Sequence, residues 1–254
     1  WNKKHGGGKI QKEMKIAYFD CFWGMSGDMF LASLIDAGVD FSLFEKRLKS
    51  AGFPHFTIEK RKVKKGEISA TQILIKAQKR RIFSYLDFKE IIKNSHLPRE
   101  IKEKSLATFT DLAEAEKKVH GVKTKDFCFA QLGEIDTLVD IVGAYLALDL
   151  LEIERVYFSL LRLARGGFFK HGKKKFPLPG PAVLELLKGI PLKLIESTAE
   201  YITPTGAVLI KNLFAGDTSQ LPPFKIISLG YGAGSINFGS SPNLLRVLLG
   251  EVTP

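Results

Sequence analysis

Lys15-Ile-Ala-Tyr-Phe-Asp20 is a short apolar and aromatic run that leads into a glycine-containing turn, Gly24-Met-Ser-Gly-Asp28. A run of this length and composition predicts a buried β-strand. The residues after the turn, Met29-Phe-Leu-Ala-Ser-Leu-Ile-Asp-Ala37, have helical character, and Gly38 is suited to end that helix. The N-terminal part of the chain is therefore predicted to fold as strand, turn and helix.

The rest of the chain mixes helical and extended patterns. They predict helices at 41–50, 84–94, 99–119, 136–151, 181–188 and 205–214, and strands at 56–63, 67–77, 155–161, 224–230 and 244–249. Residues 165–181 are rich in glycine and proline, which predicts a long irregular loop. We expect an α/β or α+β fold, with a mixed sheet and several helices, either undivided or in two lobes of residues 14–80 and 81–254.

Composition indicates a soluble folded protein. Of the 254 residues, 45% are hydrophobic and 26% are charged, and no apolar run reaches the roughly 18 residues of a membrane helix. Residues 1–13 lack the apolar segment of a secretory signal, so we expect a disordered extension there and the folded part from Met14. Two cysteines suit a reducing compartment, and we expect a cytoplasmic protein.

The net charge of +11 predicts an anionic partner, whether nucleic acid, nucleotide or an acidic small molecule. The basic runs lie at 60–65, 79–81 and 173–175, and solvated surface is the simpler interpretation of each. An RNA-binding module stays an alternative. The runs are not interleaved with aromatic residues, however, as surfaces that stack bases usually are.

The turn at 24–28 is the first candidate binding site. A glycine-rich turn before a helix presents backbone N–H groups and the positive end of the helix dipole to an anion, with Ser26 and Gly27 as candidate contacts. The alternative is capping alone, with Ser26 as N-cap and Asp28 in the first turn. Asp20 ends the preceding strand, where α/β folds place ligands, so we assign Asp20 and Asp28 as candidate metal ligands and Asp20 also as a catalytic candidate.

Asp136 and Asp140 are the second candidate group. They are separated by four residues and so share one face of the predicted helix, where like charges destabilise it. Asp140 lies among Leu138, Val139 and their apolar neighbours, so its carboxylate needs a cation, a proton or a basic partner. We assign both as catalytic candidates and Asp140 as a metal ligand, with an ion pair to Lys or Arg as the alternative.

Two further segments complete the set. His171 lies in the glycine and proline loop next to lysines, which favour its neutral, metal-binding form, although a lone loop histidine is usually only solvated. Thr203-Pro-Thr-Gly206 is typical of a helix start and offers a second anion site, with Thr203, Thr205 and Gly206 as candidate contacts.

Seven blocks of sequence in a consistent order resemble the LarC-type nickel-insertion family, over residues 14 to about 251. The blocks are Phe19–Phe30, Ala113–Gly121, Gly133–Gly143, His171-Gly172 with Pro177–Pro181, Thr203–Gly206, Gly230–Gly234 and Pro242–Arg246. The resemblance implies insertion of nickel into a pyridinium mononucleotide that carries two thiocarboxylates, with formation of a carbon–nickel bond. It also implies use of CTP with a divalent cation, Mg²⁺ or Mn²⁺, and a product that serves lactate racemase and related enzymes.

The chain departs from the family pattern at two places. Family members carry a histidine cluster where this chain has residues 79–83, and a His-Phe-His-Glu segment where it has Cys128-Phe-Ala-Gln131, so Cys128 remains as a candidate nickel ligand. The family's C-terminal domain, which the resemblance associates with CTP, lies beyond Pro254. We therefore expect a fragment of a nickel chelatase of the lyase class, one product of a split gene that a separate C-terminal chain completes, or a non-catalytic homologue that holds the nucleotide. A homo-oligomer stays open.

Overall fold

The computed structural model describes residues 13–124, 127–129, 132–171, 174–235 and 242–253. The side chains of residues 170, 171 and 174 also lie outside the described part. The predicted disordered extension, apart from residue 13, lies outside it too.

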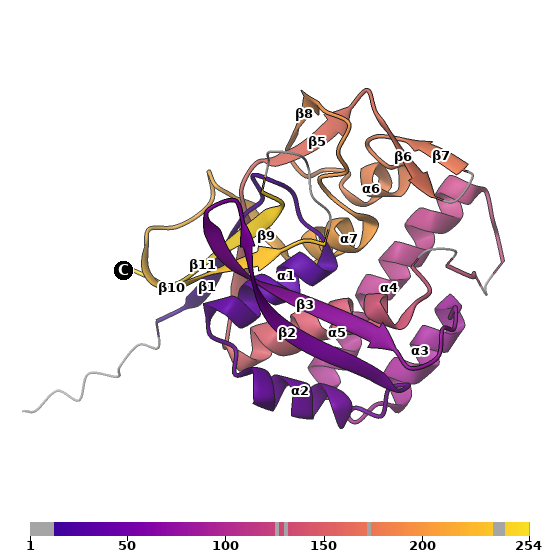
Figure 1. Cartoon of the computed structure of the whole chain (residues 1–254), viewed down its shortest axis with the longest axis horizontal. Coiled ribbons are helices and arrows are strands. Elements are labelled where there is room, and N and C mark those ends of the chain that lie inside the picture. The colour runs from indigo at the N-terminus through magenta and orange to yellow at the C-terminus, as the bar shows by residue number, and fades with distance from the viewer. Residues whose placement is uncertain (1–12, 125–126, 130–131, 172–173, 236–241, 254) are drawn as a thin grey trace, which may run out of the picture.

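Helices and strands are interspersed along the described chain, in runs of one to four elements of one kind (Figure 1). The helices are α1 Gly27–Ala37, α2 Phe41–Lys49, α3 Tyr85–Asn94, α4 Arg99–His120, α5 Ile135–Leu150, α6 Pro181–Leu186 and α7 Pro204–Leu213. The strands are β1 Lys15–Asp20, β2 Phe56–Lys65, β3 Ile68–Ala77, β4 Arg155–Phe158, β5 Leu161–Arg165, β6 Phe168–His171, β7 Lys174–Pro177, β8 Leu192–Glu196, β9 Phe214–Asp217, β10 Phe224–Ala233 and β11 Leu244–Val252.

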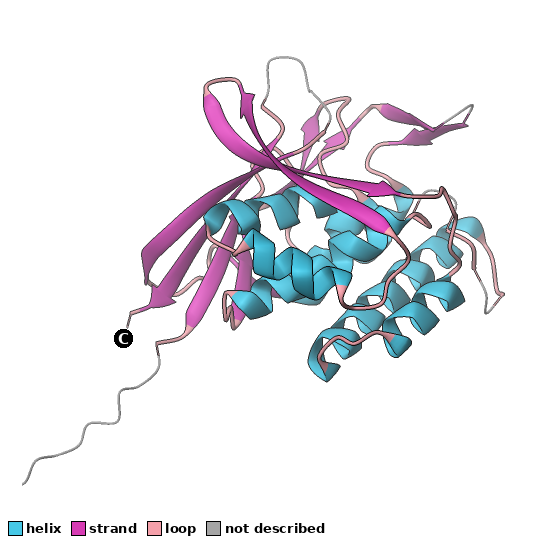
Figure 2. Cartoon of the chain, turned by 60° about the horizontal axis from the view of Figure 1, so that its bottom comes forward, coloured by secondary structure: helices cyan, strands magenta, loops and turns pink. Residues whose placement is uncertain are grey.

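A seven-stranded mixed sheet forms the centre of the molecule, with strand order β2-β3-β10-β11-β1-β4-β9. Strand β1 pairs antiparallel with β11 and parallel with β4, while β2 and β3 form a long hairpin around the turn at Gly66. Figure 2 shows that the helices gather on one side of the sheet and that the β2–β3 hairpin arches over them. The expected α/β fold with a mixed sheet is confirmed.

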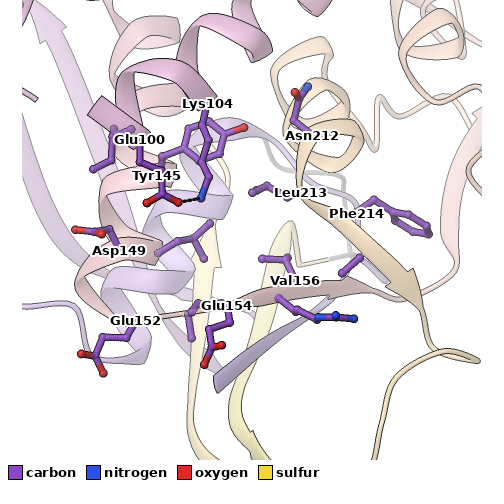
Figure 3. Close-up of a pocket in the computed structure, with 15 residues that line it drawn as sticks. Glu100, Lys104, Tyr145, Asp149, Glu152, Glu154, Val156, Asn212, Leu213 and Phe214 are labelled. Carbon is purple, nitrogen blue, oxygen red and sulfur yellow. Dashed lines mark hydrogen bonds and ion pairs between the residues drawn. The ribbon is translucent and has the colours of Figure 1, made fainter. Parts of the chain in front are cut away.

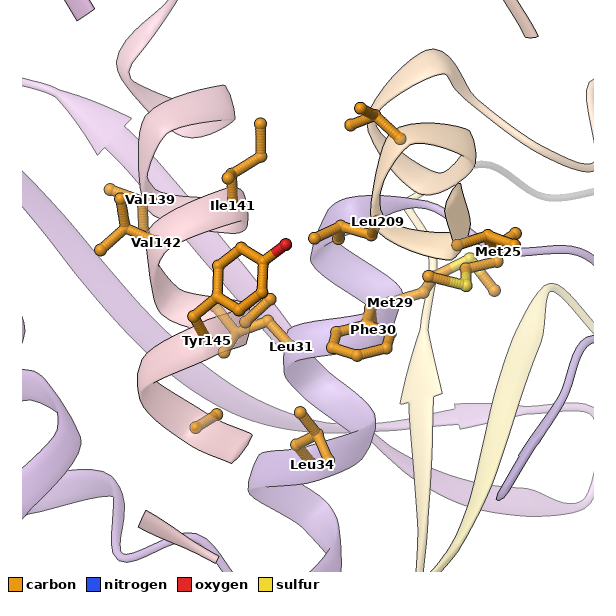
Figure 4. Close-up of a cluster of buried hydrophobic side chains, with 14 of the residues drawn as sticks. Met25, Met29, Phe30, Leu31, Leu34, Val139, Ile141, Val142, Tyr145 and Leu209 are labelled. Carbon is orange, nitrogen blue, oxygen red and sulfur yellow. The ribbon is translucent and has the colours of Figure 1, made fainter. Parts of the chain in front are cut away.

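The main core lies between the sheet and helices α1, α5 and α7. Figure 4 shows Leu31 of α1 next to Tyr145 of α5, Phe30 on the other side of α1 near Met29, and Leu209 of α7 above α1. Glycines of β10 let α1 approach the sheet, because a Cβ at Gly232 would overlap the carbonyl oxygen of Met29. This packing holds the N-terminal ends of the three helices in place.

The basic run at 60–65 lies in β2, at one edge of the sheet. Most of its side chains are exposed, and Lys62 pairs with Asp36. Charged side chains on an edge strand discourage pairing with other chains. The structure therefore agrees with the simple interpretation of this run as solvated surface.

Three sequence predictions need correction. The expected irregular loop at 165–181 contains the antiparallel hairpin of β6 and β7, whose backbone pairing the glycine and proline content did not indicate. The single strand expected at 155–161 is two strands, β4 and β5, which belong to different sheets. Strands β8 and β9 were not predicted, because β8 follows no clear alternation and β9 has only four residues.

Within the described ranges, no helix combines the length and apolarity that crossing a membrane requires.

Candidate functional site

Two of the predicted helix starts lie side by side. The backbone N–H of Met25 donates to the carbonyl oxygen of Tyr201 at 2.8 Å, and the N–H of Thr203 donates to the carbonyl oxygen of Met25 at 3.2 Å. A Cβ at Gly206 would overlap the carbonyl oxygen of Met25, so a glycine is needed for this close approach. The turn before α1 and the turn before α7 thus form one surface, although 175 residues and more separate them.

Local sequence explains both helix starts. The Thr203 side chain accepts a hydrogen bond from the N–H of Gly206 at 3.1 Å, and Pro204 occupies the first helical position, as predicted. Ser26 stands at the N-cap of α1, but its hydroxyl donates to the Asp28 carboxylate instead of accepting from the helix backbone. Ser26 at the N-cap and Asp28 in the first turn are confirmed as positions, but Asp28 and not Ser26 accepts the hydrogen bonds of the helix backbone.

The N-terminal ends of α1, α5 and α7 surround a pocket of about 400 Å³. We call it the carboxylate pocket, because four acidic side chains line it. Its other lining residues are Ser26, Gly27, Ile73, Leu74, Ile75, Leu132, Thr137, Phe169, Thr203, Pro204, Thr205 and Ser235. The four acidic ones are Asp28, Asp136, Asp140 and Glu200. The prediction that Asp136 and Asp140 share one helical face is confirmed.

Two of the aspartates serve the helix ends on which they stand. The Asp28 carboxylate accepts hydrogen bonds from the backbone N–H groups of its own residue and of Met29, and Asp136 accepts one from the N–H of Thr137 at 2.7 Å. These carboxylates satisfy N–H groups that have no partner within the helix, and the helix dipole stabilises their charge. Asp28 and Asp136 thus have a structural role in addition to facing the pocket.

Asp140 has no such support. Its residue is only 8% exposed, and its Oδ1 is a buried oxygen that lacks a hydrogen-bond partner in the described part of the chain. A Cβ at Gly27 would lie 2.5 Å from Asp140 Oδ2, so the first residue of α1 packs directly against this carboxylate. The ion pair with Lys or Arg that the sequence left open is not formed by the described residues.

The environment raises the pKa of all three aspartates. Burial raises the pKa of Asp140 well above its usual range, and the charges of Asp28 and Asp136 raise it further. Burial also raises the pKa of Asp28 and, at the more open edge of the pocket, that of Asp136, against the lowering effect of their backbone hydrogen bonds. An uncompensated buried carboxylate of this kind needs a proton or a cation.

Glu200 is a pocket residue that the sequence reasoning missed. It lies in the segment before α7, and burial alone raises its pKa to about 7. The absence of an effect from neighbouring charges separates Glu200 from the three aspartates, which act on one another. No sequence signal marks it, because Glu200 precedes the recognisable helix start by three residues and has no periodic apolar neighbours.

Two other candidates are not among the lining residues, and the side chain of a third lies outside the described part of the chain. Asp20 forms an ion pair with Arg246 of β11 at 2.5 Å and is not among the lining residues, so the structure does not bring it together with Asp140. Cys128 is exposed and bridges to Ser84 through the backbone, also away from the lining residues. His171 ends β6, and its side chain lies outside the described residues, although Phe169 of the same strand lines the pocket.

The described lining residues include no Lys or Arg, although the protein has a net charge of +11. In the described ranges, no three His, Cys, Asp or Glu side chains form a ready metal-binding group. Asp28 and Asp140 therefore offer at most a partial ligand set. Positive potential in the pocket comes from the N-terminal ends of three helices.

A larger pocket of about 480 Å³ lies at the opposite end of α5. Figure 3 shows charges of both signs around it, with Lys104 paired to Glu100 and the phenol of Tyr145 nearby. The Tyr145 hydroxyl is hydrogen bonded to Thr108 at 2.5 Å, so this buried polar group is satisfied. The larger pocket has no orphaned charged group like Asp140, and we take the carboxylate pocket as the candidate site.

Comparison with known proteins identifies relatives of the chain. A relative from Desulfitobacterium hafniense (strain DSM 10664 / DCB-2), named pyridinium-3,5-bisthiocarboxylic acid mononucleotide nickel insertion protein, is 40% identical over 94% of this chain and 59% of its own length. A protein of the same name from strain Y51 is 39% identical with the same coverage, and a relative from Citrifermentans bemidjiense is 40% identical over 94% of this chain and 62% of its own.

The chain spans about three fifths of the length of these curated relatives. No solved structure matches it significantly. The family model described as nickel insertion protein matches residues 17–254, which include the whole carboxylate pocket. The chain therefore belongs to the nickel insertion protein family.

Proposed function

We propose that the chain acts in nickel insertion into pyridinium-3,5-bisthiocarboxylic acid mononucleotide and that the carboxylate pocket is where metal and nucleotide meet. Family membership and the names of the relatives support the reaction. The observation that carries the location is Asp140, a buried carboxylate with an unpartnered oxygen at the meeting point of three helix ends.

The donor atoms of the pocket suit a divalent cation. Carboxylate oxygens bind Mg²⁺ and Mn²⁺ and also accept Ni²⁺, and a cation would supply the partner that Asp140 Oδ1 lacks. The charge of Asp28 acts on Asp140 and raises its pKa. Gly27 has no side chain and so leaves room for the Asp140 carboxylate. We assign Asp140 as the principal metal ligand, Asp28 as its neighbour, and Asp136 as an acidic group at the rim.

The nucleotide has groups of both signs, and the pocket has features for each. Its pyridinium ring is positively charged and would be attracted by the carboxylates and by the aromatic ring of Phe169, which stacks on Phe176 with centroids 5.1 Å apart. Its phosphate would be favoured by the N-terminal ends of α1 and α7, where Ser26, Gly27, Thr203, Thr205 and Gly206 lie.

The finer parts of the function belong to the same proposal. They are the use of CTP with Mg²⁺ or Mn²⁺, classification as a lyase, action in the cytoplasm, and completion of the activity by the additional length that the relatives possess. The proposal also includes a division into lobes at residue 80, roles of Asp20, Cys128 and His171 in metal transfer, and a homo-oligomer. We do not expect nucleic acid as a partner.

Metal binding by the purified chain tests the location. Isothermal titration with Ni²⁺ should reveal a site that Asp140→Asn removes, while Asp149→Asn, in the larger pocket, should leave it unchanged. Nickel insertion itself is measured by mass spectrometry of the nucleotide after incubation with Ni²⁺, CTP and Mg²⁺, in the full-length Desulfitobacterium relative that carries the equivalent substitution. Unchanged insertion in that variant would overturn the assignment of the pocket.

A further inference from the structure

The carboxylate pocket presents a charge mismatch to any anionic ligand. Four acidic side chains line it, and none of the other described lining residues is basic. A phosphate or carboxylate that enters without a cation meets the carboxyl groups of Asp28 and Asp140, and the charge of Asp28 already raises the pKa of Asp140. The partial charges at three helix ends, each about half an elementary charge, reduce this mismatch without reversing it.

The acidic groups also form an incomplete metal site. The described residues supply no group of three metal-binding side chains, and the Asp28 carboxylate is partly engaged by the N–H groups of α1. A divalent cation held by one or two carboxylates keeps several coordination positions for water or for a phosphate-bearing ligand. The unpartnered oxygen of Asp140 supplies one fixed attachment point.

We propose that a divalent cation on Asp140 and Asp28 is the receptor for the anionic groups of the mononucleotide, so that the ligand binds after the metal and through it. The cation converts a repulsive pocket into an attractive one and completes its coordination with ligand oxygen or sulfur. The α7 helix end, with Thr203 and Thr205, borders the same space and stabilises the anion from the other side. The inference rests on the proposed function of this pocket.

The proposal predicts that the effect of Asp140→Asn on anion affinity differs between metal-free buffer and Mn²⁺. A purely structural role of Asp140 would not produce this difference. In metal-free buffer, Asp140→Asn removes a carboxyl group that can carry a negative charge, so the variant should bind an anion at least as tightly as the wild type. In the presence of Mn²⁺, the same variant lacks the main metal ligand and should bind the anion more weakly than the wild type.

Glu200→Gln is the matched control. Glu200 lines the same pocket from the segment before α7, and burial alone, without an effect of the three aspartates, raises its pKa. Its replacement should tighten anion binding modestly in metal-free buffer. The gain in affinity on adding Mn²⁺ should remain, because the cation's attachment to Asp140 is intact.

The experiment is a titration calorimetry series on the whole chain, with nicotinate mononucleotide as the probe, in EDTA and in saturating Mn²⁺. We expect Mn²⁺ to tighten binding of the probe to the wild type by about tenfold or more, the effect of one charge-assisted contact. The gain should be absent in Asp140→Asn and kept in Glu200→Gln. Circular dichroism of each variant checks that it is folded, and Asp28→Asn serves as a second variant should Asp140→Asn not fold.

Direct titration with Mn²⁺ and Ni²⁺ separates the possible failures. If the metals bind at Asp140 but the probe binds equally well with and without them, metal-bridged recognition is wrong while the metal site stands. If neither metal binds the wild-type chain, the location assigned under the proposed function fails as well. Equal loss of probe affinity in EDTA and in Mn²⁺ for Asp140→Asn would make Asp140 a structural residue.

Discussion

Replacing Asp140 with Asn should stabilise the metal-free protein. The substitution keeps the shape of the side chain and removes a buried charge whose Oδ1 has no partner among the described residues. Leaving a buried polar group unsatisfied costs about 1–3 kcal/mol, and more when it is charged. We therefore expect the free energy of unfolding to rise by about 1–3 kcal/mol in EDTA.

The corresponding change in melting temperature is measurable. A chain of this size gains about 2–4 °C for each kcal/mol, so Asp140→Asn should melt roughly 2–12 °C higher. The difference should depend on pH. The folded wild type binds the Asp140 proton more tightly than the unfolded chain, so its stability falls as pH rises above the ordinary carboxyl pKa of about 4. The advantage of the variant is thus small in acid and larger at neutral pH.

Addition of metal should reverse the order of the two melting temperatures, so that the wild type melts higher than Asp140→Asn. A ligand at about 100 times its dissociation constant stabilises the folded state by about 2.7 kcal/mol, which the wild type gains and Asp140→Asn does not. The assay is differential scanning fluorimetry in EDTA and in Ni²⁺, with urea unfolding at two pH values. Asp136→Asn is the control, because its carboxylate accepts the N–H of Thr137 and its replacement should stabilise the protein less than Asp140→Asn does. A lower melting temperature for Asp140→Asn in EDTA would refute the reasoning.

Three further outcomes follow from the same geometry. Gly27→Ala should destabilise the protein by about 1–3 kcal/mol and weaken Ni²⁺ binding, because the new Cβ would lie 2.5 Å from Asp140 Oδ2. Gly180→Ala is the control in thermal melts, because its Cβ would meet no atom closer than 3.6 Å. Burial raises the pKa of Glu200 to about 7, so the stability of the wild type should fall as pH rises from about 4.5 to 7. Glu200→Gln should remove this pH dependence, and urea unfolding at the two ends of the pH range checks it. Asp20→Asn should lower stability by less than about 1 kcal/mol, because its ion pair with Arg246 is partly exposed, and should leave Ni²⁺ affinity unchanged in calorimetry.

The local parts of the site were predictable from the chain alone. Thr203 and Pro204 define a helix start through their own backbone preferences, and the structure has that start with the expected hydrogen bond. The position of Asp140 among apolar residues indicated a buried carboxylate, because a four-residue spacing and a 3.6-residue period are properties of one helix. Most helices and the longer strands were predicted because their residue patterns also lie within one element.

Only the tertiary structure decided which acidic residues meet. Asp20 ends a strand just as a ligand residue would, yet its register with β11 places it beside Arg246 and gives it a partner. Glu200 has no local pattern, and it lines the same pocket as Asp140 because the turn before α7 is hydrogen bonded to the turn before α1. Periodicity and helix-capping signals act over a few residues, whereas these encounters depend on strand register and on the packing of α1, α5 and α7 against one sheet, which no local stretch of sequence encodes.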